Sequence, residues 1–199
     1  MPNKKSMYLE GEEKFGFFLS IFYLIATKIP YLGEIYKFAS KDIASIDRAK
    51  SIIDVGCGSG DLLIAIRRLK YSGSLYGIDP SVHMINISRL RSKRLNIDFA
   101  VGSSRDIPFK RKFDLIVSSL SFHHWKEKEK SLRYLKSLLN DGGTIRIYEF
   151  EKSYVERRWF RGVSSHSISE KEITNYAKKS GLRVVELKRH KGMIRASLA

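Results

Sequence analysis

Cysteine is almost missing from this sequence of 199 residues, because Cys57 is the only one. A single thiol cannot form a disulfide within the chain, which indicates a reducing compartment, and we expect a cytoplasmic protein. Cys57 is open to two interpretations, a reactive nucleophile or a small residue packed in a turn. We favour packing, so the sequence offers no thiol chemistry as a starting point.

Long hydrophobic runs are also missing. The uncharged, aromatic segment 15–27 has 13 residues, which is short of the ~20 that span a bilayer. Glu12 and Glu13 precede this segment, unlike the basic start of a signal peptide. It is interpreted either as a buried core helix or as a lid that accepts a lipophilic ligand or touches a membrane surface. Both interpretations remain open.

Acidic residues are few beside basic ones: 21 Asp and Glu stand against 37 Lys and Arg, which gives a formal net charge of +16. Such a balance attracts RNA, an anionic membrane surface or an acidic protein. A lysine-rich proteome or a thermophile surface produces the same excess. Charge alone therefore does not identify a partner.

The segment 51–60 is the most informative stretch of the chain. An apolar, strand-like run carrying Asp54 leads into Gly56, Gly58 and Gly60, after which apolar residues recur at helical spacing. A strand, a tight glycine turn and a helix form the opening of a nucleotide-type binding site. Glycine is needed there because a side chain would strain the turn and hold a ligand away from the backbone.

The spacing of these glycines indicates which kind of nucleotide binds. The order is G-x-G-x-G, whereas a dinucleotide fingerprint reads G-x-G-x-x-G. Asp61 follows in the first helical turn, where a carboxylate suits the helix end but would repel a pyrophosphate. We therefore expect a ligand without phosphate, carrying an ammonium group that Asp54 or the loop carbonyls can bind.

A second acidic residue completes the pattern. Asp79 lies 19 residues after Gly60 and ends another strand-like run, 74–78. An acid at the tip of the second strand is placed to accept hydrogen bonds from both hydroxyls of a ribose. The glycine turn and Asp79 together predict a nucleoside.

These two motifs resemble a known family. Asp-Val-Gly-Cys-Gly-Ser-Gly at 54–60 and Gly-Ile-Asp-Pro-Ser at 77–81 are similar to motif I and the following acidic motif of class I S-adenosylmethionine-dependent methyltransferases, especially the small-molecule "type 11" branch. The resemblance covers about residues 48–199. It implies an α/β fold, a Rossmann-like three-layer sandwich whose seven-stranded, mostly parallel sheet has its last strand reversed.

The resemblance also implies which residues contact the cofactor, S-adenosylmethionine. Asp54 would lie near its ammonium group, Asp79 would hold the ribose, and Ser118 would lie near the methionine end. Gly102-Ser-Ser-Arg-Asp-Ile-Pro-Phe109 resembles a family segment that usually reads Gly-Asp-Ala-x-x-Leu-Pro-Phe, so serine stands where that family has an acid. Ser103 and Ser104 are accordingly expected to border adenine, with Asp106 as a nearby alternative. The expected cofactor-binding set is Asp54, Gly56, Gly58, Gly60, Asp79, Ser103, Ser104 and Ser118.

Two adjacent histidines, His123 and His124, follow the expected fourth strand, 113–119. Either could act as a general base that takes a proton from the methyl acceptor. Either could equally be a packing histidine at a strand end, and both interpretations remain open. We expect no metal.

The chain is divided into a helical cover, 1–47, and a single globular domain, 48–199. The first of these should contain an amphipathic helix with Leu32, Ile35, Ala39, Ile43 and Ile46 on one face. In the globular domain the patterns predict further helices at 80–94, 126–139 and 169–181, and strands at 51–55, 74–78, 96–101, 113–119, 144–150, 182–189 and 193–198.

The expected function is methyl transfer to a small molecule, and whether that acceptor is lipophilic stays open. Methylation of RNA or protein is the first alternative, with Arg157, Arg158 and Arg161 lining an open cleft. The absence of an Asn-Pro-Pro-Tyr or Asp-Pro-Pro-Tyr motif disfavours methylation of exocyclic base amines. The second alternative is a non-catalytic module that binds the cofactor.

Overall fold

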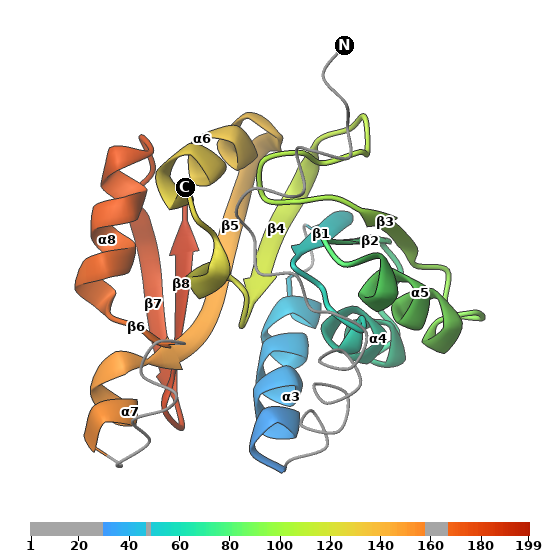
Figure 1. The fold of residues 1–199 in the computed structure, drawn as a ribbon, viewed down its shortest axis with the longest axis horizontal. Helices are drawn as coiled ribbons and strands as arrows, with labels where there is room; N and C mark the ends of the chain where they lie inside the picture. Colours follow the sequence, from blue (N-terminus) through green and yellow to red (C-terminus); the bar gives the residue numbers. More distant parts are fainter. Residues whose placement is uncertain (1–29, 47–48, 158–166) are drawn as a thin grey trace.

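The computed structural model describes residues 30–46, 49–157 and 167–199 (Figure 1). Its helices are α3 Pro30–Ala44, α4 Asp61–Arg68, α5 Val82–Arg91, the 3-10 helix η1 Phe122–His124, α6 Lys128–Ser137, α7 Lys152–Arg157 and α8 Glu170–Lys179. Its strands are β1 Ser51–Val55, β2 Ser74–Asp79, β3 Asp98–Val101, β4 Phe113–Ser119, β5 Leu139–Glu151, β6 Ser167–Ile168, β7 Val184–His190 and β8 Met193–Leu198.

One sheet organises the chain, in the order β3-β2-β1-β4-β5-β8-β7. Neighbouring strands from β3 to β5 are parallel, whereas β8 runs antiparallel to both β5 and β7. This confirms the predicted seven-stranded, mostly parallel sheet with a reversed last strand. The two-residue strand β6 pairs with the end of β5 and was not predicted.

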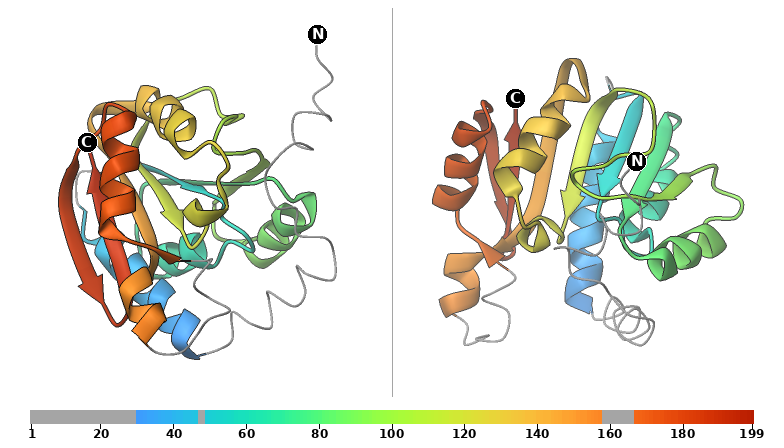
Figure 2. Two further views of the ribbon diagram at one scale, coloured as in Figure 1. Left: turned by 60° about the vertical axis from the view of Figure 1, so that its left-hand side comes forward. Right: turned by 45° about the horizontal axis from the view of Figure 1, so that its top comes forward.

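Helices cover both faces of the sheet, as expected for strands that are apolar on both sides. Figure 2 shows α4 and α5 beside the β1–β3 half of the sheet, and α6 and α8 beside the β5–β8–β7 half. One hydrophobic core includes Ile35, Ile43, Leu63, Ile66, Ile52 and Val117, which join α3 and α4 to the sheet. The other includes Phe122, Trp125, Leu132, Leu135, Ile173 and Ile147, which join η1, α6 and α8 to it.

Two helix starts follow directly from the sequence. The side chain of Ser81 accepts the backbone N–H of Met84 and caps α5. The Ser-x-x-Glu pattern at 169–172 predicts a capping box. Ser169 and Glu172 form it at the start of α8, where each side chain accepts the backbone N–H of the other residue. Helix α5 begins after the Ser81 cap and ends at Arg91, so it is shorter than the predicted helix at 80–94.

The start of β5 differs from the prediction. The run Asn-Asp-Gly-Gly at 140–143 predicts a turn between the helix at 126–139 and the strand at 144–150, but β5 already begins at Leu139. Leu139 pairs with Phe113, and the register then shifts between Phe113 and Leu115. The irregularity accommodates Gly142, whose φ is +74°, so the predicted turn is a bulge within a pair of strands.

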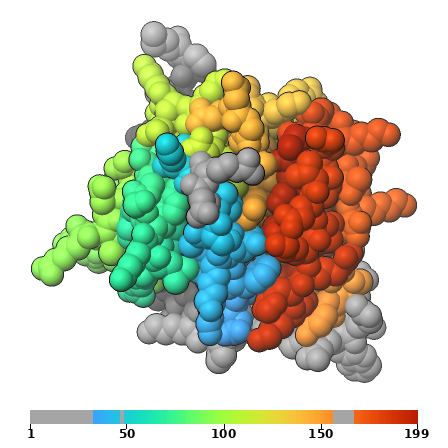
Figure 3. Space-filling view, turned by 180° about the vertical axis from the view of Figure 1, so that it is seen from behind, coloured from blue at the N-terminus to red at the C-terminus, as the bar shows by residue number. Residues whose placement is uncertain are grey.

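Helix α3 is tied to the sheet by Asp42. Its carboxylate accepts hydrogen bonds from Tyr148 Oη at 2.7 Å, Arg146 Nη1 at 2.8 Å and Arg195 Nη2 at 3.2 Å. In Figure 3 α3 lies between the α4 region and the β7–β8 hairpin on the face seen from behind. Ile35, Ala39 and Ile43 are buried, as the amphipathic pattern predicts.

The N-terminal aromatic segment, 15–27, lies outside the described residues, so the division of the chain at residue 47 stays a prediction. No helix in the described part of the chain is long and apolar enough to cross a membrane.

Candidate functional site

The glycine turn sits on the end of β2. The backbone N–H groups of Gly56 and Cys57 both donate to the carbonyl of Ile78, at 2.8 and 2.9 Å. Gly56, Gly58 and Gly60 have φ values of +81°, +52° and +80°, which L side chains rarely adopt. The turn therefore requires the glycines that the sequence places there.

Close packing adds a second reason for glycine. A Cβ on Gly56 would lie 2.3 Å from Ser121 Oγ, and one on Gly60 would lie 2.9 Å from Phe99 Cζ. The turn is thus pressed against the loop after β4 and against β3. No side chain can be added at Gly56 without displacing Ser121.

Asp79 holds the glycine turn through its carboxylate. Its Oδ2 accepts the backbone N–H of Gly58 at 2.9 Å, and its Oδ1 accepts that of Ser81 at 2.8 Å. The residue is 7% exposed. Asp79, which is predicted to bind the ribose, therefore also fixes the glycine turn relative to β2 and α5.

Asp54 lies at the end of β1 and is 2% exposed. Its Oδ1 has no hydrogen-bond partner among the described residues. Burial raises the pKa of this carboxyl to about 8, and the charge of Asp79 adds to the shift. A buried acid with an unused oxygen favours a cationic ligand, because a positive charge would restore its ionised form.

Cys57 behaves as a packed residue. It is buried within the turn, and burial raises the pKa of its thiol well above the usual value, with Asp79 and Asp54 adding to the effect. A thiol held in its protonated form is a poor nucleophile. The structure supports the packing interpretation.

The end of β4 is joined to β1 by serine hydroxyls. Ser121 Oγ donates to the carbonyl of Val55 at 2.7 Å and lies 2.9 Å from Ser118 Oγ. Ser118 is fully buried, and the buried Oγ of Ser119 has no partner among the described residues. Ser118 is thus linked to the glycine turn through Ser121. The sequence did not indicate this contact of Ser121.

The predicted adenine segment lies beside Asp79, since Gly102 N–H donates to the Asp79 carbonyl at 3.2 Å. Ser103 and Asp106 exchange backbone hydrogen bonds at 3.0 and 3.1 Å, so they form one tight turn. The hydroxyl of Ser104 lies 2.8 Å from that of Ser131 on α6. The side chain of Ser104 is thus engaged with α6, and the contacts of Ser103 and Ser104 with adenine stay a prediction.

The two histidines lie in η1, directly after the β4 loop. His123 Nδ1 lies 2.8 Å from Glu149 Oε2, and the side chain of Glu149 is fully buried. The rings of His123 and His124 are 3.9 Å apart between centroids. Glu149 was not predicted as a site residue, although a carboxylate between Tyr148 and Phe150 in an expected buried strand was a usable signal.

Comparison with known proteins decides the family. A family described as "Methyltransferase domain" matches residues 46–185. The chain belongs to this family.

A curated relative, the ubiquinone/menaquinone biosynthesis C-methyltransferase UbiE of Yersinia pestis, is 27% identical over 159 residues. That alignment covers 73% of this chain and 63% of UbiE, so the chain matches less than two thirds of the relative's length. The chain is a class I S-adenosylmethionine-dependent methyltransferase domain, as the two motifs predicted.

Solved structures show the same fold. An S-adenosylmethionine-dependent methyltransferase from Aquifex aeolicus has a TM-score of 0.66 at 24% identity and covers 74% of this chain and 80% of its own. The magnesium protoporphyrin IX methyltransferase ChlM of Synechocystis, solved with bound S-adenosylhomocysteine, has a TM-score of 0.63 at 14% identity over 84% of this chain and 82% of its own.

The methyltransferase site fits a sulfonium nucleoside in its chemistry. The unused oxygen of Asp54 suits an ammonium group, and Gly56, Gly58 and Gly60 carry no side chain that would hold a ligand away from their backbone. Asp61, expected to repel a phosphate, is paired with Arg91 at 2.7 Å, which weakens that argument. Among the described residues no group of three His, Cys, Asp or Glu could hold a metal ion.

Proposed function

We propose that this methyltransferase transfers the methyl group of S-adenosylmethionine to a small molecule. The proposal is supported by the curated relative, whose name assigns it to ubiquinone and menaquinone biosynthesis. ChlM, which shares the fold, is named for a porphyrin substrate. Both acceptors are small molecules rather than RNA or protein.

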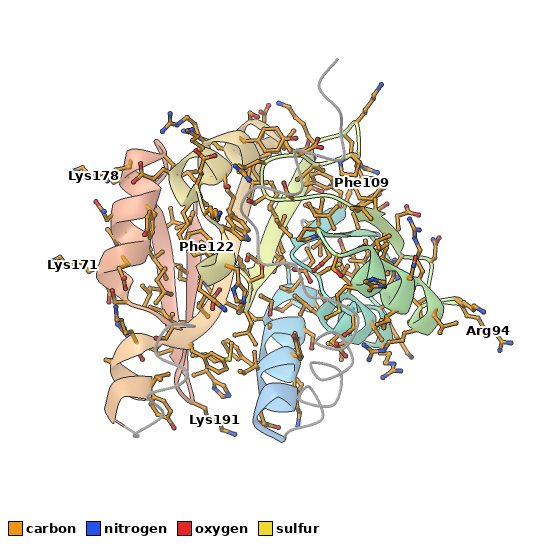
Figure 4. All side chains as sticks on the ribbon, in the orientation of Figure 1. Arg94, Phe109, Phe122, Lys171, Lys178 and Lys191 are labelled. Carbon is orange, nitrogen blue, oxygen red and sulfur yellow. The ribbon has the colours of Figure 1, made fainter. Side chains whose placement is uncertain are left out.

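The acidic residues of the site support the proposal from within this chain. Three buried carboxylates, Asp54, Asp79 and Glu149, lie at the carboxyl ends of β1, β2 and β5. A site lined by carboxyl groups suits a cationic cofactor, because a positive charge would restore the ionised form of Asp54. In Figure 4 several basic side chains point outward at the periphery instead, including Lys171 and Lys178 on α8.

Roles follow for the cofactor residues. Asp54 would bind the ammonium group, Asp79 the ribose hydroxyls, and Ser103 the adenine edge. The backbone of Gly56, Gly58 and Gly60 would approach the methionine portion, with Ser104 bordering adenine and Ser118 near the methionine end.

The chemistry that the cofactor supplies is an electrophilic methyl group on a sulfonium with a neutral leaving group. The chain must align the acceptor with that methyl group, and positioning of this kind can remove ~7–11 kcal/mol of barrier. His123 or His124 would take the acceptor's proton, which contributes roughly 10²–10⁴-fold.

The test uses methyl-labelled S-adenosylmethionine and fractionated cell extract. We expect label in a small-molecule fraction, extractable into organic solvent if the acceptor is lipophilic, and less label with an Asp79→Ala variant, whose affinity for the cofactor should be lower. Label in RNA or protein would overturn the small-molecule proposal. Cofactor binding without transfer to any fraction would indicate a non-catalytic module.

A further inference from the structure

The side chain of Glu149 does more than fill the core. Its Oε2 lies 2.8 Å from His123 Nδ1, and its Oε1 accepts the backbone N–H of His123 at 3.2 Å. Both oxygens are thus directed at one residue, from a carboxylate that is fully buried. This arrangement fixes the ring of His123 relative to β5.

A carboxylate also selects the tautomer of the imidazole. An ionised carboxylate can only accept hydrogen bonds, so the nitrogen that faces it must carry the proton. With the proton on Nδ1, the lone pair of the neutral ring lies on Nε2. The same carboxylate–histidine geometry orients general bases and stabilises the imidazolium that forms when they take a proton.

The position of η1 places this pair at the edge of the sheet where the cofactor motifs lie. Ser121, immediately before η1, donates to the carbonyl of Val55 at 2.7 Å, and its Oγ is the atom nearest to a Cβ built on Gly56. His123 is two residues further along and 8% exposed in its side chain. The ring is therefore attached to the loop that packs on the glycine turn.

Other charged groups surround the pair. Lys128 on α6 donates from Nζ to the carbonyls of His123 and Trp125, at 2.9 and 2.6 Å. Burial lowers the pKa of Lys128, while Glu149 and Glu172 on α8 oppose that shift. The ammonium group of Lys128 thus lies beside the Glu149–His123 pair and interacts electrostatically with Glu149.

We propose that Glu149 is the positioning residue of His123, holding the imidazole so that Nε2 accepts the proton of the methyl acceptor. The inference rests on the proposed function and chooses His123 over His124 as the general base. The acceptor loses one proton and gains the methyl group, the sulfonium becomes a neutral thioether, and the proton passes from His123 to solvent.

The first test reads the tautomer without turnover. Protein labelled with ¹⁵N-histidine contains five histidines, and a His123→Gln variant assigns the signals of His123. Above the pH at which the ring loses its charge, we expect a protonated Nδ1 and an unprotonated Nε2. In Glu149→Gln the amide can turn its NH₂ to Nδ1, so the population of the Nε2–H tautomer should rise.

Glu151→Gln is the matched control. Glu151 lies two residues further along β5 and pairs with Arg189 at 2.9 Å, away from His123. This variant removes one carboxylate from the same strand and should leave the His123 signals unchanged. Glu149→Asp keeps a carboxylate on a shorter side chain and should retain the Nδ1–H tautomer if Glu149→Gln fails to fold.

The second test separates positioning from cofactor binding. We expect Glu149→Gln to bind S-adenosylhomocysteine within about twofold of wild type in calorimetry. Its kcat for the labelled small-molecule fraction should fall 10- to 100-fold, with KM nearly unchanged, as for other residues that orient a functional histidine. Glu149→Asp should recover part of the loss.

An Nε2–H tautomer in wild type, or an unchanged kcat in folded Glu149→Gln, would overturn the role of Glu149. Failure of wild-type protein to bind S-adenosylhomocysteine would overturn the proposed function and the base role with it. The tautomer of His123 is read from its ¹⁵N signals, and cofactor binding is read from calorimetry. Failure of the Glu149 role is therefore distinguished from failure of the proposed function.

Discussion

The carboxylate of Asp79 accepts the backbone N–H of Gly58 at 2.9 Å, so the acid at the end of β2 holds the turn at the end of β1. We predict that Asp79→Ala weakens S-adenosylmethionine binding by about 1–3 kcal/mol, because charged hydrogen bonds are lost. Titration calorimetry measures the change. The control Asp98→Ala removes an exposed acid from the start of β3 and should leave affinity unaltered. Equal affinity in both variants would rule out Asp79 as a ligand.

The glycine turn allows a comparison of two kinds of strain. Gly56 and Gly142 both have positive φ, at +81° and +74°, but only at Gly56 would a Cβ collide with a neighbour. Gly142→Ala should lower the free energy of unfolding by about 1–2 kcal/mol, which is the cost of placing an L side chain at positive φ. Gly56→Ala should cost more and also abolish cofactor binding, because Ser121 must move. Urea unfolding and calorimetry check this, and equal losses of stability would contradict the packing argument.

Most of the cofactor residues could be predicted because their motif is local. Asp54, the glycines and Asp79 occupy consecutive elements of one β-α-β unit, so their spacing along the chain determines their spatial relationship. The capping box at Ser169 was predictable for the same reason.

The contacts that were missed join distant parts of the sequence. Ser121 reaches Val55 across 66 positions, and Glu149 reaches His123 across 26. Which side chain meets which depends on the strand order and register, which single-sequence patterns do not specify. The early start of β5 has the same origin, because Leu139 belongs to the strand only through its pairing with Phe113.

Burial of Asp54 should make stability depend on pH. Its folded pKa of about 8 lies above the ordinary 3.8, so the folded state keeps a proton that the unfolded state loses. The free energy of unfolding should therefore fall as pH rises from about 4 to 8, by at most about 1.4 kcal/mol per pH unit.

Asp54→Asn removes this titration while keeping the side-chain shape. We expect its stability to exceed that of wild type at pH 8 and to match it near pH 4, while its affinity for S-adenosylmethionine falls. Urea unfolding at several pH values measures the difference. Parallel pH curves for the two proteins would show that Asp54 is ionised in the folded state.

Asp42 on α3 contacts Arg146, Tyr148 and Arg195 of the sheet. We predict that the attachment of α3 depends on these contacts more than on any other ion pair of this helix. Arg195 is fully buried and pairs with Asp42 and Glu186. Removing one partner leaves a buried charge undercompensated, so Asp42→Ala should lower the free energy of unfolding by about 3 kcal/mol, whereas replacing a whole buried pair by apolar residues is often neutral. Glu34→Gln is the control. Glu34 lies on α3, like Asp42, and its side chain pairs with Lys191 at the surface, so this variant should leave the free energy of unfolding unchanged.

A double variant, Asp42→Leu with Arg195→Met, distinguishes charge from packing. It removes both charges and fills the space with apolar groups, so it should recover most of the stability lost in Asp42→Ala. Urea unfolding of the three variants measures the coupling between the two sites. If the double variant is instead less stable than Asp42→Ala, the remaining hydrogen bonds of Arg195 to Glu186 and Ser197 contribute more to stability than the buried charge costs.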